Sequence, residues 1–322
     1  MSDPAPPFGA KIAAGTANRR MHASEDTPRS ASPRDDQANL NPPAAWADLG
    51  DLFMPVPKTT RALEAGFYTP IETMRGRALR RMRVRTDNLV ELPDPVIDTL
   101  LTEFVTFWKR AAAFGGIGLS PKRGLLLWGP PGSGKTSAVQ RMAEHMIREL
   151  GGICVMAGPP SLTAEILHDL RMIEPHRPLV VVFEDLDALV DRFGEPELLA
   201  LLDGETQIGN VVNVATTNYP ELLDPRFVNR PGRFDRIQYV GMPTEEAREV
   251  YIKARVPGID DVRLARWVKD SDGWSIAHLR ELVVATEMLG DADDATIERL
   301  AGMHQKPDSK RSPELSAVGF GA

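Results

Sequence analysis

The chain has 322 residues, a formal net charge of −7 and a hydrophobic fraction of 42%. This length permits one to three domains with a full core, and the acidic balance excludes an overall electrostatic attraction to nucleic acid. The one cysteine, Cys154, excludes a disulfide framework and lies in an apolar stretch typical of a core position. No run approaches the ~18 apolar residues of a membrane span, and the first residues lack a signal-peptide pattern. We therefore expect a cytoplasmic protein that does not contact a membrane.

Composition and hydrophobic periodicity divide the chain into five regions. The two ends are rich in proline, serine and charged residues, and cannot bury enough apolar surface to fold. The expected regions are a disordered N-terminal tail (1–45), an accessory N-terminal region (46–110), an α/β domain (111–242), a small helical domain (243–303) and a disordered C-terminal tail (304–322).

Apolar strands alternate with helical patterns from Arg123 onward, as in a parallel sheet whose crossover connections are helices. Before this point, apolar residues on one stripe predict a helix from Pro95 to Ala113. After Pro243 the strand patterns stop, and Thr244 followed by two acids is typical of a helix cap. The expected strands cover residues 124–128, 152–157, 179–183, 210–215 and 236–240.

An eight-residue segment from Gly129 to Thr136 follows an apolar run and precedes a helical pattern, which is the setting of a phosphate-binding P-loop. Its glycines let backbone N–H groups turn toward the phosphates, and the N-terminus of the helix is electropositive. Lys135 supplies positive charge for the β- and γ-phosphates, and the Thr136 hydroxyl can ligate Mg²⁺. The expected nucleotide-binding residues are Gly129, Pro130, Pro131, Gly132, Ser133, Gly134, Lys135, Thr136 and Ser137.

Polar residues follow the next expected strands. Glu184 and Asp185 come directly after the apolar run 180–183, at the edge where open α/β sheets bind ligands. One carboxylate can hold Mg²⁺ and the other can polarise the attacking water. Asn218 ends a later strand and can bind the γ-phosphate or the lytic water, or form the turn before Pro220.

Four arginines lie between residues 223 and 236, namely Arg226, Arg230, Arg233 and Arg236. Arginine stabilises the charge that develops on a transferring phosphoryl group, and a neighbouring subunit can supply it in trans.

Four ordered segments, GPPGSGKT, FEDLDAL, ATTNYPELLDP and RPGRFDR, resemble the Walker A, Walker B, sensor 1 and second region of homology of AAA ATPases, over about residues 121–290. The resemblance implies a P-loop NTPase with a three-layer α/β/α sheet and a small helical lid. It also implies ATP and Mg²⁺ as cofactors, and a homo-oligomeric ring, commonly a hexamer, with nucleotide at the subunit interfaces. The resemblance implies that Lys135 and Thr136 are the Walker A pair and that Thr136 and Glu184 bind Mg²⁺. It implies that Asp185 activates the attacking water and that Asn218 is sensor 1. Arg230 and Arg233 would be the arginine fingers, Arg236 would make a structural contact, and Arg226 has no assigned role.

Three features depart from the family's pattern. Walker B reads Glu184-Asp185 where Asp-Glu is usual, an order similar to that of the mitochondrial Rieske-protein translocase. The shorter Asp185 changes the reach to the water by ~1.5 Å. Residues 158–162 lack the aromatic–aliphatic–glycine pore loop, which leaves threading of a client in doubt. His278 stands where aspartate is common, and Arg280 is either a sensor 2 arginine or a surface residue.

An arginine cluster precedes the P-loop region, with six arginines in eleven residues: Arg75, Arg77, Arg80, Arg81, Arg83 and Arg85. The cluster can bind nucleic-acid phosphates or an acidic partner surface. It can also be a solvated face or a subunit contact, because no aromatic residue is interleaved to stack on bases.

Together these observations predict an ATP-hydrolysing, ring-forming AAA ATPase that remodels a protein or a protein–nucleic-acid assembly. One alternative is a nucleic-acid-associated loader or helicase partner, and another is a nucleotide-gated scaffold with little turnover. The compact size resembles that of small AAA proteins of bacteria and their phages. No motif names the client.

Overall fold

The computed structural model describes residues 45–48, 51, 53–56, 59–74, 76–83, 90–203, 209–228 and 232–303. They belong to two compact units, one within residues 1–60 and the other within residues 61–322. The two expected tails lie outside the described residues, apart from Ala45. The described part of the first unit contains an antiparallel hairpin of β1 (Ala45–Asp48) and β2 (Phe53–Val56).

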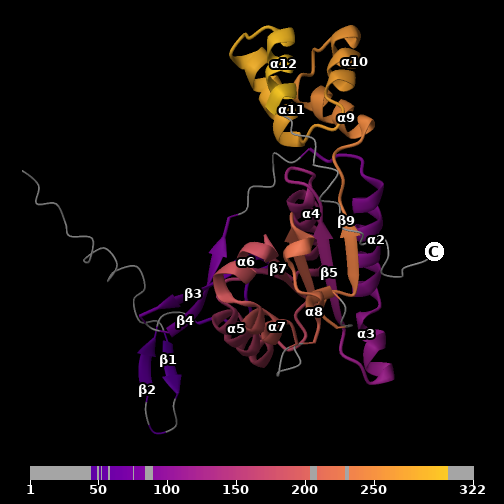
Figure 1. Ribbon diagram of the computed structural model, residues 1–322. Coiled ribbons are helices and arrows are strands. Elements are labelled where there is room, and N and C mark those ends of the chain that lie inside the picture. The colour runs from indigo at the N-terminus through magenta and orange to yellow at the C-terminus, as the bar shows by residue number, and fades with distance from the viewer. Residues whose placement is uncertain are drawn as a thin grey trace, which may run out of the picture. The chain divides into compact units, whose positions relative to one another are not determined.

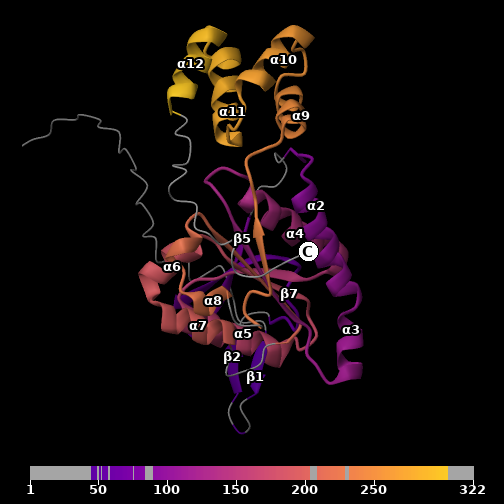
Figure 2. The same ribbon diagram turned by 45° about the vertical axis from the view of Figure 1, so that its right-hand side comes forward.

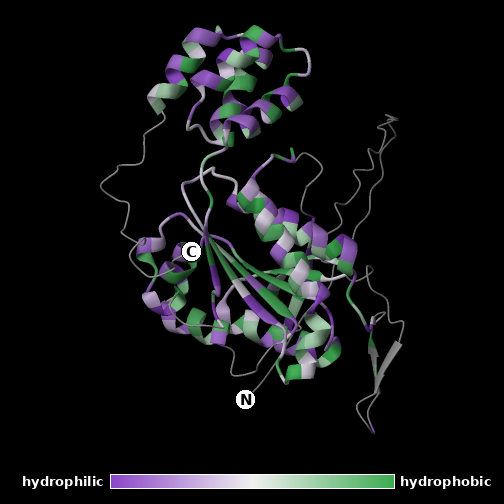
Figure 3. Ribbon diagram, turned by 90° about the vertical axis from the view of Figure 1, so that its right-hand side faces the viewer, coloured by the Kyte–Doolittle hydropathy of each residue, from purple (hydrophilic) through white to green (hydrophobic). Residues whose placement is uncertain are grey.

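The second unit is built on one sheet, whose described strands run in the order β4-β3-β6-β7-β8-β5-β9. Within these strands the neighbours pair in parallel, except that the edge strand β4 is antiparallel to β3 (Figure 1). The central strands are strongly hydrophobic because helices cover both faces (Figure 3). The strands are β3 (Gly66–Thr73), β4 (Gly76–Met82), β5 (Lys122–Trp128), β6 (Ile153–Met156), β7 (Leu179–Phe183), β8 (Val211–Thr217) and β9 (Arg236–Tyr239).

Helices form a layer on each face of this sheet (Figures 1 and 2). Residues of α2 and α4 share one core cluster with the strands, while residues of α5, α6, α7 and α8 share the other. The expected three-layer α/β/α fold is therefore confirmed. The helices are α2 (Pro95–Lys109), α3 (Ala111–Phe114), α4 (Lys135–Leu150), α5 (Pro160–Ile173), α6 (Leu186–Phe193), α7 (Glu195–Asp203) and α8 (Pro225–Val228), with short 3-10 turns at Gly115–Ile117 and Pro220–Leu222.

The helical lid has a core of its own, centred on the fully buried Trp267 and on Trp274. Side chains of Thr244, Asp260 and Ser275 accept N–H bonds at the starts of three of its helices, and the cap expected at Thr244 is confirmed. The lid comprises α9 (Glu245–Arg255), α10 (Asp261–Asp270), α11 (Ile276–Val283), a π-helical turn (Val284–Met288) and α12 (Asp293–Met303).

The boundary expected at residue 110 does not coincide with a division of the fold. β3 pairs in parallel with β6 over Gly66–Tyr68 and Ile153–Val155, so it extends the central sheet. α2 contributes Phe104 and Trp108 to the core that it shares with α4. Residues 61–110 thus belong to the same sheet and core as the P-loop. The sequence pattern does not predict β3, because a proline such as Pro70 is disfavoured within a strand.

The other expected elements lie close to their predicted positions. The strands expected from residue 124 onward are present with ends shifted by one or two residues, and the helix expected to reach Ala113 is interrupted at Arg110. Cys154 is fully buried in β6, and burial raises the pKa of its thiol. Among the described helices, none combines the length and apolar character needed to cross a lipid bilayer.

Candidate nucleotide site

The P-loop connects the end of β5 to the start of α4 through three glycines with positive φ. Gly129, Gly132 and Gly134 have φ values of 154°, 77° and 103°. A Cβ on Gly129 would lie 2.1 Å from the carbonyl oxygen of Val240, so the loop packs too closely there for any side chain. The loop is therefore held in a fixed curve, with the N-terminus of the sixteen-residue helix α4 at its end.

Lys135 lies at the first position of α4 and is only 6% exposed. Its Nζ donates hydrogen bonds to the carbonyl oxygens of Gly129 and Pro130, at 2.8 and 2.9 Å. Burial lowers the pKa of the ammonium group, and the charges of Asp185 and Asp187 oppose this effect. The structure thus brings Lys135 within electrostatic reach of the carboxylates that follow β7.

Glu184 and Asp185 are exposed side chains directly after the buried strand β7. Partial burial, and then the charge of Asp185, raise the pKa of Glu184. Asp185 adopts a left-handed conformation, with φ 49° and ψ 62°, and its N–H donates to the hydroxyl oxygen of Thr216 at 3.1 Å. This turn lets the chain leave the strand and begin α6 at Leu186 while both carboxylates face solvent at the sheet edge.

The neighbouring strand β8 lies between β7 and β5 and ends beside the same edge. Thr217, which is fully buried, donates a hydrogen bond to Asp187 at 2.6 Å and so ties β8 to the start of α6. Asn218 follows as a half-buried residue, and its side chain forms no hydrogen bond with any described residue. Asn218, which we expect to act as sensor 1, therefore lies just after β8 at this edge of the sheet.

A cavity of about 620 Å³ adjoins the P-loop. It is bounded by P-loop residues, by the chain that leads into α2, and by the lid. Val90 and Leu92 also pack against the lid core, which explains how the segment before α2 comes to line it. Its lining includes Val90, Leu92, Ile97, Ser133, Ser137, Tyr251, Ile276, Arg280 and Val283.

Sequence reasoning missed most of this apolar lining. Of the lid residues in the cavity wall, it singled out Arg280, an exposed residue that faces this cavity. Val90, Tyr251 and Ile276 have no motif, since an apolar residue that lines a ligand cavity looks like any core residue. Only their positions in the folded chain, close to the P-loop helix and to the cap of α11, identify them as lining residues.

The lid also approaches the P-loop directly through the cap of α11. A Cβ on Gly132 would lie 2.7 Å from the Cβ of Ser275, which is itself 3% exposed. The Ser275 hydroxyl forms a hydrogen bond of 2.8 Å with Nδ1 of His278. His278, which stands where aspartate is common, therefore fixes the side chain of the cap serine. The lid and the phosphate loop are thus in close packing at one point.

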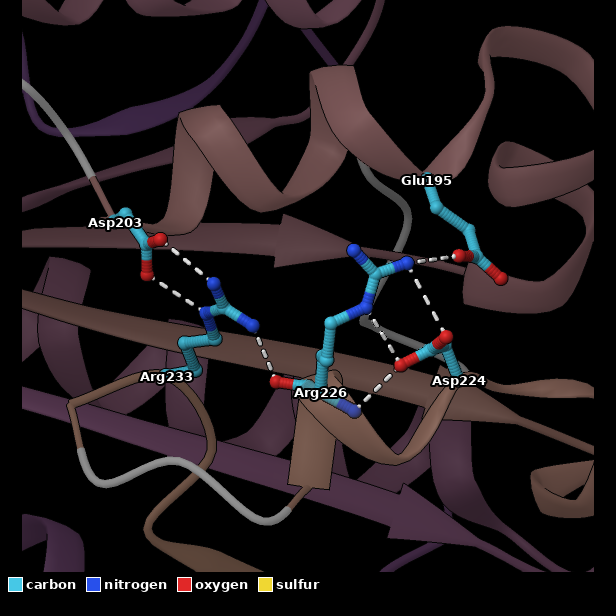
Figure 4. A network of polar contacts seen from close by, with 5 residues as sticks. All are labelled: Glu195, Asp203, Asp224, Arg226 and Arg233. Atoms are coloured by element: carbon cyan, nitrogen blue, oxygen red, sulfur yellow. Dashed lines mark hydrogen bonds and ion pairs between the residues drawn. The ribbon is translucent and has the colours of Figure 1, made fainter.

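Arg233, expected as an arginine finger, lies inside its own subunit. It is 4% exposed and forms a two-pronged ion pair with Asp203, at the end of α7, with a shortest distance of 2.6 Å (Figure 4). The same guanidinium donates to the carbonyl oxygen of Arg226. Arg230 lies outside the described residues, so its expected role stays a prediction.

Arg226 is held in turn by acids on both sides. Its guanidinium pairs with Asp224 and with Glu195 at the start of α7, at 2.9 and 2.8 Å, while its side chain remains 59% exposed (Figure 4). The two ends of α7 are therefore fastened to the segment 224–233 by separate arginines. Arg236 forms a longer ion pair with Glu103 of α2, at 3.6 Å, in line with the structural contact expected of it.

The residues present fit a nucleoside triphosphate. The buried hydroxyl of Ser133 has no hydrogen-bond partner within the described residues. It could therefore donate a hydrogen bond to a phosphate oxygen of a bound nucleotide. No cluster of three or more metal-binding side chains occurs among the described residues. A Mg²⁺ ion here would therefore rely on Thr136, Glu184, water and the phosphates themselves, which is how Mg²⁺ is usually held beside nucleotides.

Comparison with known proteins agrees with this geometry. The sequence model of the ATPase family associated with various cellular activities (AAA) matches residues 125–242. A proteasome-activating nucleotidase of Methanothermobacter thermautotrophicus is 30% identical over 243 residues, which cover 66% of this chain and 58% of the relative. The cell division cycle protein 48 homologue of Archaeoglobus fulgidus is 30% identical over 194 residues, covering 54% of this chain and 26% of the relative.

A third relative is the ATP-dependent zinc metalloprotease FtsH of Acaryochloris marina, which is 30% identical over 255 residues, or 69% of this chain and 39% of the relative. The chain spans between 26% and 58% of the length of these three relatives. The residues that the family model matches include the P-loop, the paired acids and Arg233. Residues 125–242 therefore form a domain of the AAA family of ATPases.

Proposed function

We propose that this chain is a Mg²⁺-dependent ATPase that acts as a homo-oligomeric ring and uses ATP hydrolysis to remodel a protein client. The observation that carries the proposal is the meeting of Lys135, the Glu184-Asp185 pair and Asn218 at the carboxyl ends of β5, β7 and β8. The adjoining cavity of about 620 Å³ supplies an apolar pocket for the base.

ATP would supply the phosphoryl group, with Mg²⁺ to neutralise its charge. Lys135 would exchange its bonds to the Gly129 and Pro130 carbonyls for the β- and γ-phosphate oxygens. Thr136 and Glu184 would hold the metal, the carboxylate through water. Asp185 would take the proton of the attacking water, and Asn218 would orient that water or the γ-phosphate.

The ring proposal concerns the segment around residue 230. Arg230 is our candidate for the residue that reaches the γ-phosphate of a neighbouring subunit. Arg233 is already paired with Asp203 in its own chain, so we assign it a structural role instead, in which it holds its own segment against α7. Turnover would then require two subunits, and ATP binding would strengthen their interface.

The protein client is supported by the names of the relatives, which refer to the proteasome and to a metalloprotease. The segment between β6 and α5 does not support threading of this client through a pore. Only residues 157–159 separate β6 from α5, and the segment 158–162 contains no aromatic residue. A nucleotide-gated scaffold is the second candidate, favoured by the order Glu184-Asp185 and its shorter second acid.

The test is steady-state ATP hydrolysis with Mg²⁺ over a range of protein concentrations, with the native chain beside Asp185→Asn. A specific rate that rises steeply with concentration, and that disappears in the variant, supports a site completed between subunits. Nucleotide binding by both proteins, without turnover at any concentration, would replace the ATPase proposal with the scaffold.

A further inference from the structure

The edge strand β4 has an unused row of backbone hydrogen-bonding groups. β3 pairs with one side of β4, and within the described residues no strand pairs with the other (Figure 1). The register places Leu79 opposite Pro70, which has no N–H and so cannot exchange two hydrogen bonds with its partner. This pair is therefore of the non-hydrogen-bonded kind. The N–H and C=O groups of Leu79, and by alternation those of Arg77 and Arg81, point away from β3.

Two arginines of this edge are already neutralised inside the subunit. Arg77 binds Glu165 and Asp169 of α5, at 3.0 and 2.6 Å, and Arg81 binds Glu64. These contacts fasten the β3–β4 hairpin to the body of the fold. They also leave less of the arginine cluster available to a ligand than the sequence suggests.

Three other arginines near this edge form no ion pair with any described residue. Arg80 and Arg83 are exposed and form no ion pair with any described residue. Arg148, in the last turn of α4, is likewise without an ion-pair partner in the described part of the chain. Arg83 and Arg148 line a hollow of about 650 Å³ at the end of β4, where the acid in the lining is Glu144. This part of an otherwise acidic chain is therefore basic.

We propose that the β4 edge binds an extended acidic segment of a partner protein as an added strand. The backbone row of β4 supplies the pairing, and the free arginines supply the selectivity for acidic side chains. Ala78, Arg80 and Met82 share one face of the strand because side chains alternate. The segment that fits carries an acid opposite Arg80, apolar residues on either side of it, and a second acid toward Arg83 and Arg148.

A peptide fits this surface better than a nucleic acid. The free strand edge repeats donors and acceptors at the spacing of another strand, which a sugar–phosphate backbone does not match. Residues 76–83 contain no aromatic side chain on which bases could stack. The proposal does not depend on ATP hydrolysis, so its success or failure is separate from that of the ATPase proposal.

The test uses the full chain and a fluorescently labelled peptide that alternates glutamate with valine, followed by fluorescence anisotropy. Two matched probes are the same peptide with lysine in place of glutamate, and the glutamate peptide with alternate backbone amides methylated. The protein variants are the Arg80→Glu/Arg83→Glu pair and, as a control, Arg110→Glu, an exposed arginine of the α2 end. Far-ultraviolet circular dichroism and thermal unfolding show that each variant is folded.

We expect saturable binding of the acidic peptide, weakened about tenfold or more by the double substitution and by amide methylation, and unchanged in Arg110→Glu. The lysine peptide should not bind. Absence of binding, or binding that methylation leaves intact, overturns strand addition. Displacement of the peptide by a single-stranded oligonucleotide at lower concentration would identify a nucleic-acid surface instead, and self-association lost in the double variant would identify a second copy of the chain.

Discussion

Arg233 and Asp203 form a two-pronged ion pair within one chain, with Nε and Nη2 at 2.7 and 2.6 Å from the two carboxylate oxygens. The backbone beside this pair is equally constrained. A Cβ on Gly124 of β5 would lie 1.6 Å from the carbonyl oxygen of Arg233, so the strand and the loop are in direct contact. Asp235 accepts hydrogen bonds from the N–H groups of Gly124 and Gly232, at 3.0 and 2.8 Å. The segment 232–235 is thus held against β5.

Replacement of Arg233 should therefore destabilise the single subunit. We expect Arg233→Ala to lower the free energy of unfolding by about 2–4 kcal/mol, because Asp203 loses its buried partner. Urea unfolding at protein concentrations below assembly measures this. Arg226→Ala is the control, because its ion pairs are exposed to solvent and should contribute far less to stability than the Arg233 pair. Native stability of Arg233→Ala together with loss of turnover only in the assembled protein would return Arg233 to the role of a trans-acting finger.

Arg230 should act on a neighbouring subunit. We expect Arg230→Ala to bind nucleotide like the native chain and to hydrolyse ATP up to ~10³-fold more slowly. Lys135→Ala should be inactive for a different reason, because it cannot hold the phosphates. Mixing the two inactive variants places an intact Arg230 beside an intact P-loop in some interfaces. Recovery of ATP hydrolysis on mixing checks the prediction, and a mixture as inactive as its components contradicts it.

Asp185 adopts a left-handed backbone conformation, in addition to its proposed role in activating water. Its φ of 49° is tolerated by aspartate and asparagine and is less favourable for glutamate. We expect Asp185→Asn to keep the native stability and lose turnover, whereas Asp185→Glu should keep a carboxylate and lose about 1 kcal/mol of stability. Thermal unfolding and ATPase rates of the two variants separate these effects. Equal stability of the two would show that the left-handed turn is not required.

The approach of the lid to the P-loop can be tested with two neighbouring glycines. Both Gly132 and Gly134 have positive φ, but a side chain at Gly132 would collide with Ser275, while one at Gly134 would meet no atom within 4 Å. Both alanine variants carry the backbone strain of about 1–2 kcal/mol. We expect Gly132→Ala to bind a fluorescent ATP analogue more weakly than Gly134→Ala. Equal affinities would mean that the lid moves away from the loop at no cost.

Acid should weaken the partly buried ion pair between Arg263 and Asp293 of the lid. Hydrogen bonding to Arg263 holds the pKa of Asp293 below its ordinary value of 3.8, and Trp267 donates a second bond at 2.9 Å. Since the folded-state pKa is depressed, the pair stabilises the lid above pH 3.8 and loses this contribution as the pH falls further. We expect Asp293→Asn to cost about 1–3 kcal/mol at neutral pH. The difference in unfolding free energy from the native chain should shrink below pH 3.8.

Local motifs made much of the site predictable. A P-loop needs glycines at fixed positions, and a strand that runs into two acids places them at the sheet edge, so Lys135, Glu184 and Asp185 could be placed from sequence spacing alone. Arg233 could not, because an arginine is expected to be exposed and its partner Asp203 lies 30 residues earlier. Only the folded chain shows that the pair is internal.

The N-terminal extension of the sheet was hidden for a similar reason. β3 pairs with β6, about 90 residues later in the chain, and such long-range pairing leaves no local pattern. Pro70 further weakened the strand signal. The lining of the cavity beside the P-loop is also non-local, since Val90 and Ile276 come together only when the lid packs against the segment before α2.

The pairing of β3 with β6 bears on how this ATPase domain can be produced for study. Ile153, Cys154 and Val155 are fully buried, and β3 shields the backbone of β6 at this point. A recombinant fragment that began at the family match, near residue 125, would turn β6 into a bare apolar edge and remove α2 from the core. Such edges recruit other chains. A fragment intended to remain monomeric and folded should therefore begin near Arg61.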